Sequence, residues 1–176
     1  MKMHSLVIAV VILSMGACAR EEVIPERLTG NVNRDFDLVE ARHNPEAYLG
    51  TLVLVGGEVL SATRREEGTR MEVLHRPLSS DLVPREDRKS DGRFVAIDQE
   101  RQVIDPALLE EHKLVTIVGE VVGMDTVKID GISKTVPQLR VKQVTLWEWK
   151  PGYPDYGHYA PYAWGSNGYY AYPQRK

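Results

Sequence analysis

The chain of 176 residues contains a single cysteine, Cys18, so it cannot form an intramolecular disulfide. A structural zinc site built from Cys and His is excluded for the same reason. Neither sign of charge predominates, because 22 Lys and Arg oppose 25 Asp and Glu and leave a net charge of −3. Binding to nucleic acid needs a basic stripe or domain. We therefore expect no nucleic-acid partner.

Signatures of catalysis are also lacking. The chain contains no HExxH zinc motif, GxSxG nucleophile turn, phosphate-binding P-loop or dinucleotide-binding glycine pattern. The histidines are scattered, one in each segment, and structural or solvent-facing roles are expected for His4, His43, His75, His112 and His158. We expect no catalytic residue, metal or cofactor. A hydrolase is the alternative if the fold gathers His75 or His112 with a carboxylate and a hydroxyl.

The longest apolar run, Leu6–Leu13, is too short to cross a bilayer core, which takes about 20 helical residues. It follows the positive charge of Lys2 and precedes small residues, as in a secretory signal peptide, which we place at residues 1–17. Gly16 and Ala17, directly before Cys18, resemble the lipobox of bacterial lipoproteins. Met15 departs from that pattern, because Leu is usual there.

The lipobox resemblance implies cleavage between Ala17 and Cys18 and attachment of diacylglycerol and a further acyl chain, such as palmitate, at Cys18. The protein would then be held on a membrane by this lipid. Ala19 stands where inner-membrane lipoproteins of enteric bacteria typically carry Asp, so the resemblance implies the outer membrane, facing the periplasm. The alternatives are an ordinary signal peptide cut after Ala17, with a free Cys18 thiol, and an uncleaved anchor helix.

The mature chain divides by composition into three parts. Residues 18–34 are polar, contain Pro25 and Gly30, and predict a solvated, lipidated tether. Residues 35–150 carry the signals of a folded domain. Residues 151–176 hold seven of the eight tyrosines, with four prolines and four glycines, and predict a disordered low-complexity tail without a strand.

Two short helices are predicted in the folded domain. The first covers residues 44–50, with Asn44 as N-cap, Pro45 at the first helical position and Gly50 after the end. The second covers residues 105–112, with Asp105 as cap.

Strand signals fill the rest of this domain. The strands are expected at residues 51–63, 69–77, 93–98, 113–129 and 135–149. Gly56-Gly57 predicts a bulge or bend in the first, and Gly119 or Gly123 a kink in the fourth. Asp130-Gly131 predicts a hairpin turn. Core residues are expected in the last strand at Val136, Leu139, Val141, Val144 and Leu146.

Five strands with a helix between the third and fourth match the order of an OB-like Greek-key barrel. Long strands with glycine kinks suit such a barrel, because strands must bend around the core. The fold class predicted is therefore mainly β, a five-stranded barrel with short helices. A β-sandwich or a meander is the alternative.

Aromatic residues near the end of the chain suggest a binding surface. Trp147 and Trp149 alternate with Glu148 and so face one side of the last strand, where they either end the core or form a candidate binding shelf. The Tyr-rich tail is either a terminus with no partner or a surface for membrane headgroups, peptidoglycan, lipopolysaccharide or another envelope protein.

Several segments together resemble the Slp family, the starvation-inducible outer-membrane lipoproteins of Gram-negative bacteria. They are Tyr48-Leu49-Gly50, Gly56-Gly57-Glu58-Val59, Gly68-Thr69-Arg70-Met71-Glu72-Val73, Pro77-Leu78, Gly92-Arg93-Phe94, Asp105-Pro106, Val115-Thr116-Ile117-Val118-Gly119-Glu120 and Trp147. Val136 before Pro137 departs from the family, which often has Tyr there. The resemblance implies an outer-membrane lipoprotein linked to starvation and envelope stress, with no established catalytic residues.

The function expected from these observations is a non-catalytic structural or binding role in the cell envelope. The alternative is an OB-type periplasmic module that binds an oligosaccharide or a peptide. Such a module would present aromatic or polar residues on its second and third strands.

Overall fold

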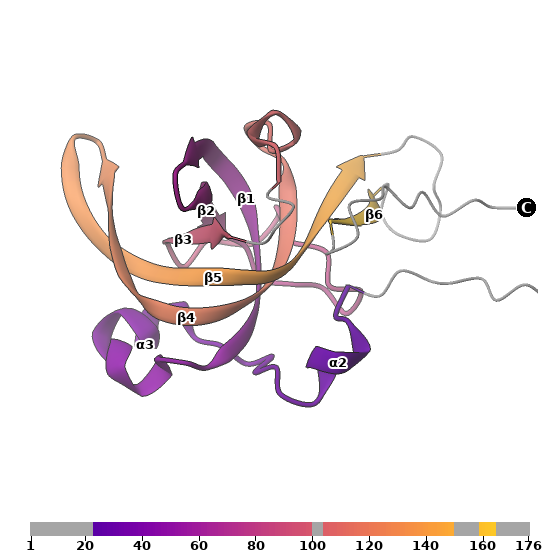
Figure 1. Ribbon diagram of the computed structural model, residues 1–176, viewed down its shortest axis with the longest axis horizontal. Coiled ribbons are helices and arrows are strands. Elements are labelled where there is room, and N and C mark those ends of the chain that lie inside the picture. The colour runs from indigo at the N-terminus through magenta and orange to yellow at the C-terminus, as the bar shows by residue number, and fades with distance from the viewer. Residues whose placement is uncertain (1–22, 100–103, 150–158, 165–176) are drawn as a thin grey trace, which may run out of the picture.

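The computed structural model of the protein describes residues 23–99, 104–149 and 159–164 (Figure 1). The predicted signal peptide, the Cys18 lipidation site and most of the predicted tail lie outside these residues. Within the described part of the chain, no helix is long and apolar enough to cross a membrane.

Five strands form a closed barrel: β1 (Leu52–Arg65), β2 (Gly68–His75), β3 (Arg93–Asp98), β4 (Leu114–Ile129) and β5 (Ile132–Trp149). Their order is β3-β2-β1-β4-β5, with antiparallel neighbours. A parallel pairing between β3 and β5 closes the barrel, and Figure 1 shows β3 lying beside β5. The predicted OB-like Greek-key barrel is confirmed, and every strand end lies within three residues of its predicted position.

The barrel interior is filled by side chains that alternate along the strands. Its buried cluster contains Val53, Val55, Val59, Met71, Val73, Phe94, Ala96, Val115, Ile117, Val121, Leu139, Val141, Val144 and Leu146. A second cluster lies on the opposite face of β3, where Val95 and Ile97 pack against Val127 and Val136. Four of the five core residues predicted in the last strand are therefore inside the barrel, and Val136 is buried outside it.

The predicted glycine kinks are confirmed in β4, whereas the bulge predicted at Gly56-Gly57 in β1 is wrong. The β4 register shifts next to Gly119 and Gly123, as predicted. The β1 bulge instead lies between Val59 and Ser61. A Cβ atom at Gly57 would lie 2.3 Å from Val73 Cγ1, so glycine there permits the close approach of β1 and β2.

The β4–β5 hairpin turns at Asp130-Gly131, as predicted. Both residues have positive φ, 51° and 80°, which is the requirement of the type I′ hairpin turn.

The helices are shorter than predicted. The first prediction corresponds only to the 3₁₀ helix η1 (Pro45–Tyr48), and Asn44 makes no side-chain capping bond. An unpredicted helix, α3 (Leu38–His43), precedes it, because Asp37 Oδ1 accepts hydrogen bonds from the Val39 and Glu40 amides at 2.7 and 3.0 Å.

The second predicted helix forms only the single turn η2 (Pro106–Leu108). Asp105 caps it, as predicted, by accepting a hydrogen bond from the Ala107 amide. The helix cannot continue to residue 112, because His112 adopts a left-handed φ of 70°.

The prediction of a solvated tether was wrong for residues 23–34, which we call the N-terminal strap. The strap contains the short helix α2 (Glu26–Thr29) and packs on the outer face of the barrel, where Ile24 is buried against Leu54 and Val118. The Asn33 amide donates to the Leu52 carbonyl at 2.8 Å, and the Asn33 carbonyl accepts from the Leu54 amide at 3.0 Å. These bonds satisfy backbone groups at the start of β1.

The prediction that the tail contains no strand was also wrong. The backbone of β6 (Tyr159–Trp164) pairs antiparallel with β5 between Val144 and Trp149. β6 is an edge strand, the position in a sheet at which a proline such as Pro161 is tolerated.

Two isoleucines provide a matched test of the core. Ile104 is fully buried, whereas Ile132 is 59% exposed. We expect Ile104→Ala to lower the free energy of unfolding by about 2–5 kcal/mol through lost burial and a cavity. Ile132→Ala should change it by no more than about 0.5 kcal/mol. Urea unfolding followed by tryptophan fluorescence measures both, and equal losses would contradict this assignment of the core.

Candidate functional site

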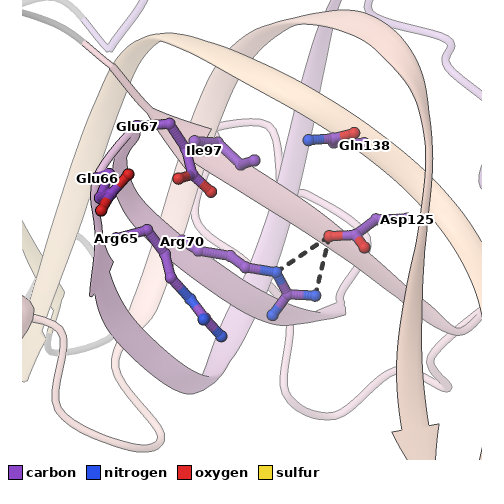
Figure 2. Close-up of a pocket in the computed structure, with 7 residues that line it drawn as sticks. All are labelled: Arg65, Glu66, Glu67, Arg70, Ile97, Asp125 and Gln138. Atoms are coloured by element: carbon purple, nitrogen blue, oxygen red, sulfur yellow. Dashed lines mark hydrogen bonds and ion pairs between the residues drawn. The ribbon is translucent and has the colours of Figure 1, made fainter.

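An open groove of about 570 Å³ lies between the β1–β2 turn and the outer half of the β4–β5 hairpin (Figure 2). It is lined by Arg65, Glu66, Glu67, Arg70, Ile97, Asp125 and Gln138. Each of the five barrel strands or their turns contributes, so the groove forms only in the closed barrel.

The groove floor follows the line where the barrel closes. Arg70 on β2 pairs with Ile97 on β3. Gln138 on β5 pairs with Val95, two residues before Ile97, in the parallel pairing of β3 with β5. The apolar Ile97 side chain therefore lies between two hydrogen-bonding side chains.

An ion pair holds the β4–β5 hairpin over this floor. Figure 2 shows the Arg70 guanidinium pointing at Asp125, whose Oδ2 lies 3.0 Å from both Nε and Nη2. Asp125 follows the β4 register shift at Gly123, which has a φ of 147°. This bend turns the outer half of β4 toward β2.

The β1–β2 turn supplies the groove with exposed charge. Glu66 and Glu67 are exposed, and among the described residues their carboxylates have no ion-pair partner. Arg65 offers a guanidinium at the same rim. The lining can thus donate and accept hydrogen bonds and carries both signs of charge, which suits a polar ligand.

A second polar cluster joins Glu58, Arg76 and His112 on the barrel surface. The Glu58 carboxylate is 2.8 Å from Arg76 Nη2 and 2.5 Å from His112 Nδ1. Burial would raise the pKa of Glu58, but the hydrogen bonds from His112 and Arg76 hold this pKa below its ordinary value. The hydrogen bond to Glu58 raises the pKa of the exposed His112.

These shifts have opposite pH dependences. The lowered Glu58 pKa stabilises the fold above pH 4.5, and this contribution is lost as the pH falls through the lowered value. The raised His112 pKa stabilises the fold below pH 6.5, and this contribution is lost as the pH rises through the raised value. Between these limits the cluster contributes most.

His75 lies in a different environment. Its Nδ1 is 3.4 Å from Asp91 Oδ2, and its side chain is largely buried. Burial lowers the pKa of His75, and the nearby Asp91 and Asp37 carboxylates oppose this shift only in part.

Neither histidine lines the groove, and the third group at Glu58 is the Arg76 guanidinium, not a hydroxyl. The two histidines are paired with separate carboxylates. Among the described residues, no three His, Cys, Asp or Glu side chains are grouped to hold a metal ion.

The structure does not place Trp147 on a binding shelf. Its side chain is 3% exposed, and Nε1 donates to Thr116 Oγ1 at 2.9 Å. Thr116 Oγ1 in turn donates to the Leu82 carbonyl at 2.6 Å. Trp147 therefore belongs to the packed outer face of the barrel. Of the two alternatives predicted from sequence, it ends the packed interior of the protein and does not form a shelf. The Trp149 side chain, Ala17 and Cys18 lie outside the described residues.

The groove residues were not identified from sequence as a site. Glu66 and Glu67 are recognisable as a charged turn, but such turns are usually only solvated. Arg70 and Asp125 are 55 residues apart, and no local pattern indicates their pairing.

A model of the outer membrane lipoprotein Slp family matches residues 15–174. The chain belongs to this family. The resemblance predicted from sequence is confirmed, and membership in a lipoprotein family implies a signal peptide and lipidation. The match extends over the barrel and includes Cys18.

Two relatives of this Slp-family chain come from Escherichia coli (strain K12). Outer membrane protein Slp is 25% identical over a match of 165 aligned positions, and the match covers 84% of this chain and 85% of the relative. The uncharacterized lipoprotein YeaY is 31% identical over 124 residues, 69% of this chain and 61% of the relative.

Among solved structures, the mitochondrial single-stranded DNA binding protein Rim1 of S. cerevisiae is 13% identical, with a TM-score of 0.30. The likeness covers 55% of this chain and 93% of that one. It is too distant to indicate a ligand for the Slp-family chain.

The two histidines test the electrostatics of the Slp-family barrel. We expect NMR titration to place the His112 midpoint above 6.5 and the His75 midpoint below 6.5. Glu58→Gln should return His112 toward 6.5 and leave His75 unchanged, because His75 does not contact Glu58. Asp91→Asn should lower the His75 midpoint further. A His112 midpoint that ignores Glu58→Gln would refute the pairing.

Proposed function

We propose that the protein is anchored through lipid at Cys18 in the outer membrane, faces the periplasm, and has a non-catalytic structural or binding role in the cell envelope. The family match carries this proposal, because it begins at residue 15 and includes the Gly16-Ala17-Cys18 lipobox. The proposed link to starvation or envelope stress rests on the family resemblance.

The anchor is physically sufficient for permanent attachment. Each buried methylene contributes about 0.8 kcal/mol, and one acyl chain alone gives only reversible binding. A diacylglycerol with a further acyl chain at Cys18 would exceed that limit. No spanning helix is then needed to hold the barrel at the membrane.

The barrel supports a structural or surface-binding role. Its interior is filled by packed side chains such as Phe94, Ile117 and Leu139, all fully buried. A barrel packed in this way binds partners on its outer surface. The seven tyrosines after Pro151 each carry an apolar ring with a polar hydroxyl. This chemistry supports contacts with peptidoglycan, lipopolysaccharide or another envelope protein.

The anchor is tested by intact mass and membrane fractionation of wild type beside Cys18→Ser. We expect wild type to carry the added lipid mass and to sediment with outer membrane, because the thiol is the acylated group. Cys18→Ser should remain an unlipidated precursor. Soluble wild type and mutant, both cut after Ala17, would contradict the proposal.

A second candidate function is an OB-type module that binds an oligosaccharide or a peptide. The groove favours it, because its lining places polar Arg70 on β2 beside Ile97 on β3, the strands expected to carry a ligand. The exposed carboxylates of Glu66 and Glu67 and the Gln138 amide would bind hydroxyl or amide groups.

Groove binding is tested by NMR titration with a peptidoglycan-derived disaccharide peptide. We expect saturable shifts at Arg70, Ile97 and Gln138, because these residues form the groove floor. Glu67→Ala with Gln138→Ala should weaken binding at least about tenfold if two hydrogen bonds of about 1 kcal/mol each are lost.

Glu120→Ala is the control for this titration. Glu120 pairs with Lys142 on the barrel surface at 3.0 Å and does not line the groove. Equal weakening by the control and the groove variant, or shifts spread over the whole barrel, would reject the groove as the binding site.

A further inference from the structure

We propose that the surface around the N-terminal strap is the side of the barrel that lies against the lipid bilayer, and that the groove opens away from it. This inference rests on the proposed lipid anchor at Cys18. It adds an orientation of the barrel and names the lipid-facing surface, neither of which the anchor alone specifies.

The first support is the short reach of the chain before the strap. Only four residues separate Cys18 from Val23. Even fully extended, the chain from Cys18 to Val23 spans at most about 18 Å. The barrel surface at Val23 is therefore held within that distance of the acylated residue.

The second support is that the strap is fixed to the barrel from its first turn. Ile24 is buried against Leu54 and Val118, and the Asn33 backbone is bonded to both Leu52 and Leu54. If residues 23–34 were a free tether, more than ten extra residues would let the barrel rotate freely. Packed as they are, they transmit the position of the anchor to one face of the barrel.

The groove lies far from this face. Leu54 lies under the strap, and Arg65, at the groove, is eleven residues further along the same strand. Measured along the strand these eleven residues span roughly 36 Å, and the bulge between Val59 and Ser61 makes the direct distance shorter. Figure 1 shows α2 at the lower right and the β4–β5 hairpin, which lines one side of the groove, at the far left.

The strap surface has a composition that suits a bilayer interface. Leu28 and Val32 pack with Ile24 against the barrel, whereas Val23 and Pro25, the strap residues nearest the anchor, are partly exposed. The exposed side of α2 carries Glu26 and Arg27, so it has no net charge, and the Arg27 guanidinium can reach lipid phosphates. Amphipathic residues of these kinds are favoured at a headgroup surface.

The orientation is tested with the full-length lipoprotein in vesicles of phosphatidylethanolamine and phosphatidylglycerol that contain a headgroup-quencher lipid. A fluorophore is placed at Arg27→Cys, Glu66→Cys or Ile132→Cys, and the acylated Cys18 does not react. Glu66 follows the last residue of β1, and Ile132 pairs with Ile129, eleven residues beyond Val118 on β4. Because each is separated from the strap by roughly 36 Å measured along a strand, we expect quenching at Arg27 to be at least about twofold stronger than at the other two.

An insertion of about ten Gly and Ser residues between Glu22 and Val23 is the matched control. It adds about 17 Å of average reach, so quenching at Arg27 should fall while flotation with the vesicles is unchanged. Unchanged quenching at Arg27 would overturn the claim that the short chain between Cys18 and Val23 holds the strap at the bilayer.

Flotation separates this inference from the proposed function. If the wild-type protein floats with the vesicles and all three labels are quenched equally, the orientation is overturned and the anchor stands. If the wild-type protein does not float, the anchor is absent, and both the proposed function and the orientation are rejected.

Discussion

Three residue pairs between β3 and β5 turn the sheet into a barrel: Val95 with Gln138, Ala96 with Leu139 and Ile97 with Arg140. Alternation along the strands places Ala96 and Leu139 in the interior and Val95 and Ile97 on the outer face. Ala96 and Leu139 complete the core. Val95 and Ile97 pack against Val127 and Val136 and so support the β4–β5 hairpin. Because Ile97 and Gln138 also form the groove floor, the candidate site exists only where this closure forms. Stability and site geometry therefore depend on the same short parallel pairing.

Part of the outer face of the barrel is also covered. The strap, Leu78 and Leu82 pack over Leu54 and Val118, and Trp147 is hydrogen-bonded into the same layer through Thr116. This explains why residues 114–119 of β4 are buried without alternation, since both faces of the strand are covered there. It also gives the proposed orientation its basis, because the residues nearest the anchor are part of this layer. The polar groove lies beyond it, at the other end of β1.

Turns and caps were predicted correctly where the residues themselves meet the whole backbone requirement of the turn or cap. Asp130-Gly131 satisfies the positive φ of a hairpin turn at both positions, and Asp105 caps the turn that follows it. Asn44 carries the same kind of signal as Asp37, yet only Asp37 caps a helix, because packing of Leu38 and Ala41 into the core decides which turn continues. The Arg70–Asp125 pair could not be predicted, since it depends on how far β4 curls after Gly123.

The sequence by itself determined the lipoprotein family, the number and order of the barrel strands, their turns and most of the core, because each of these is encoded in residues close together in the chain. Tertiary structure decided what covers the outer face. The sequence predicts a tether for the strap and no strand in the tail, because these polar and proline-containing segments form structure only on an edge or face that other strands provide. The burial of Trp147 and the formation of the groove were also decided by tertiary structure. Their burial and their charge pairing arise from strands that are distant in sequence and adjacent only after the barrel has closed.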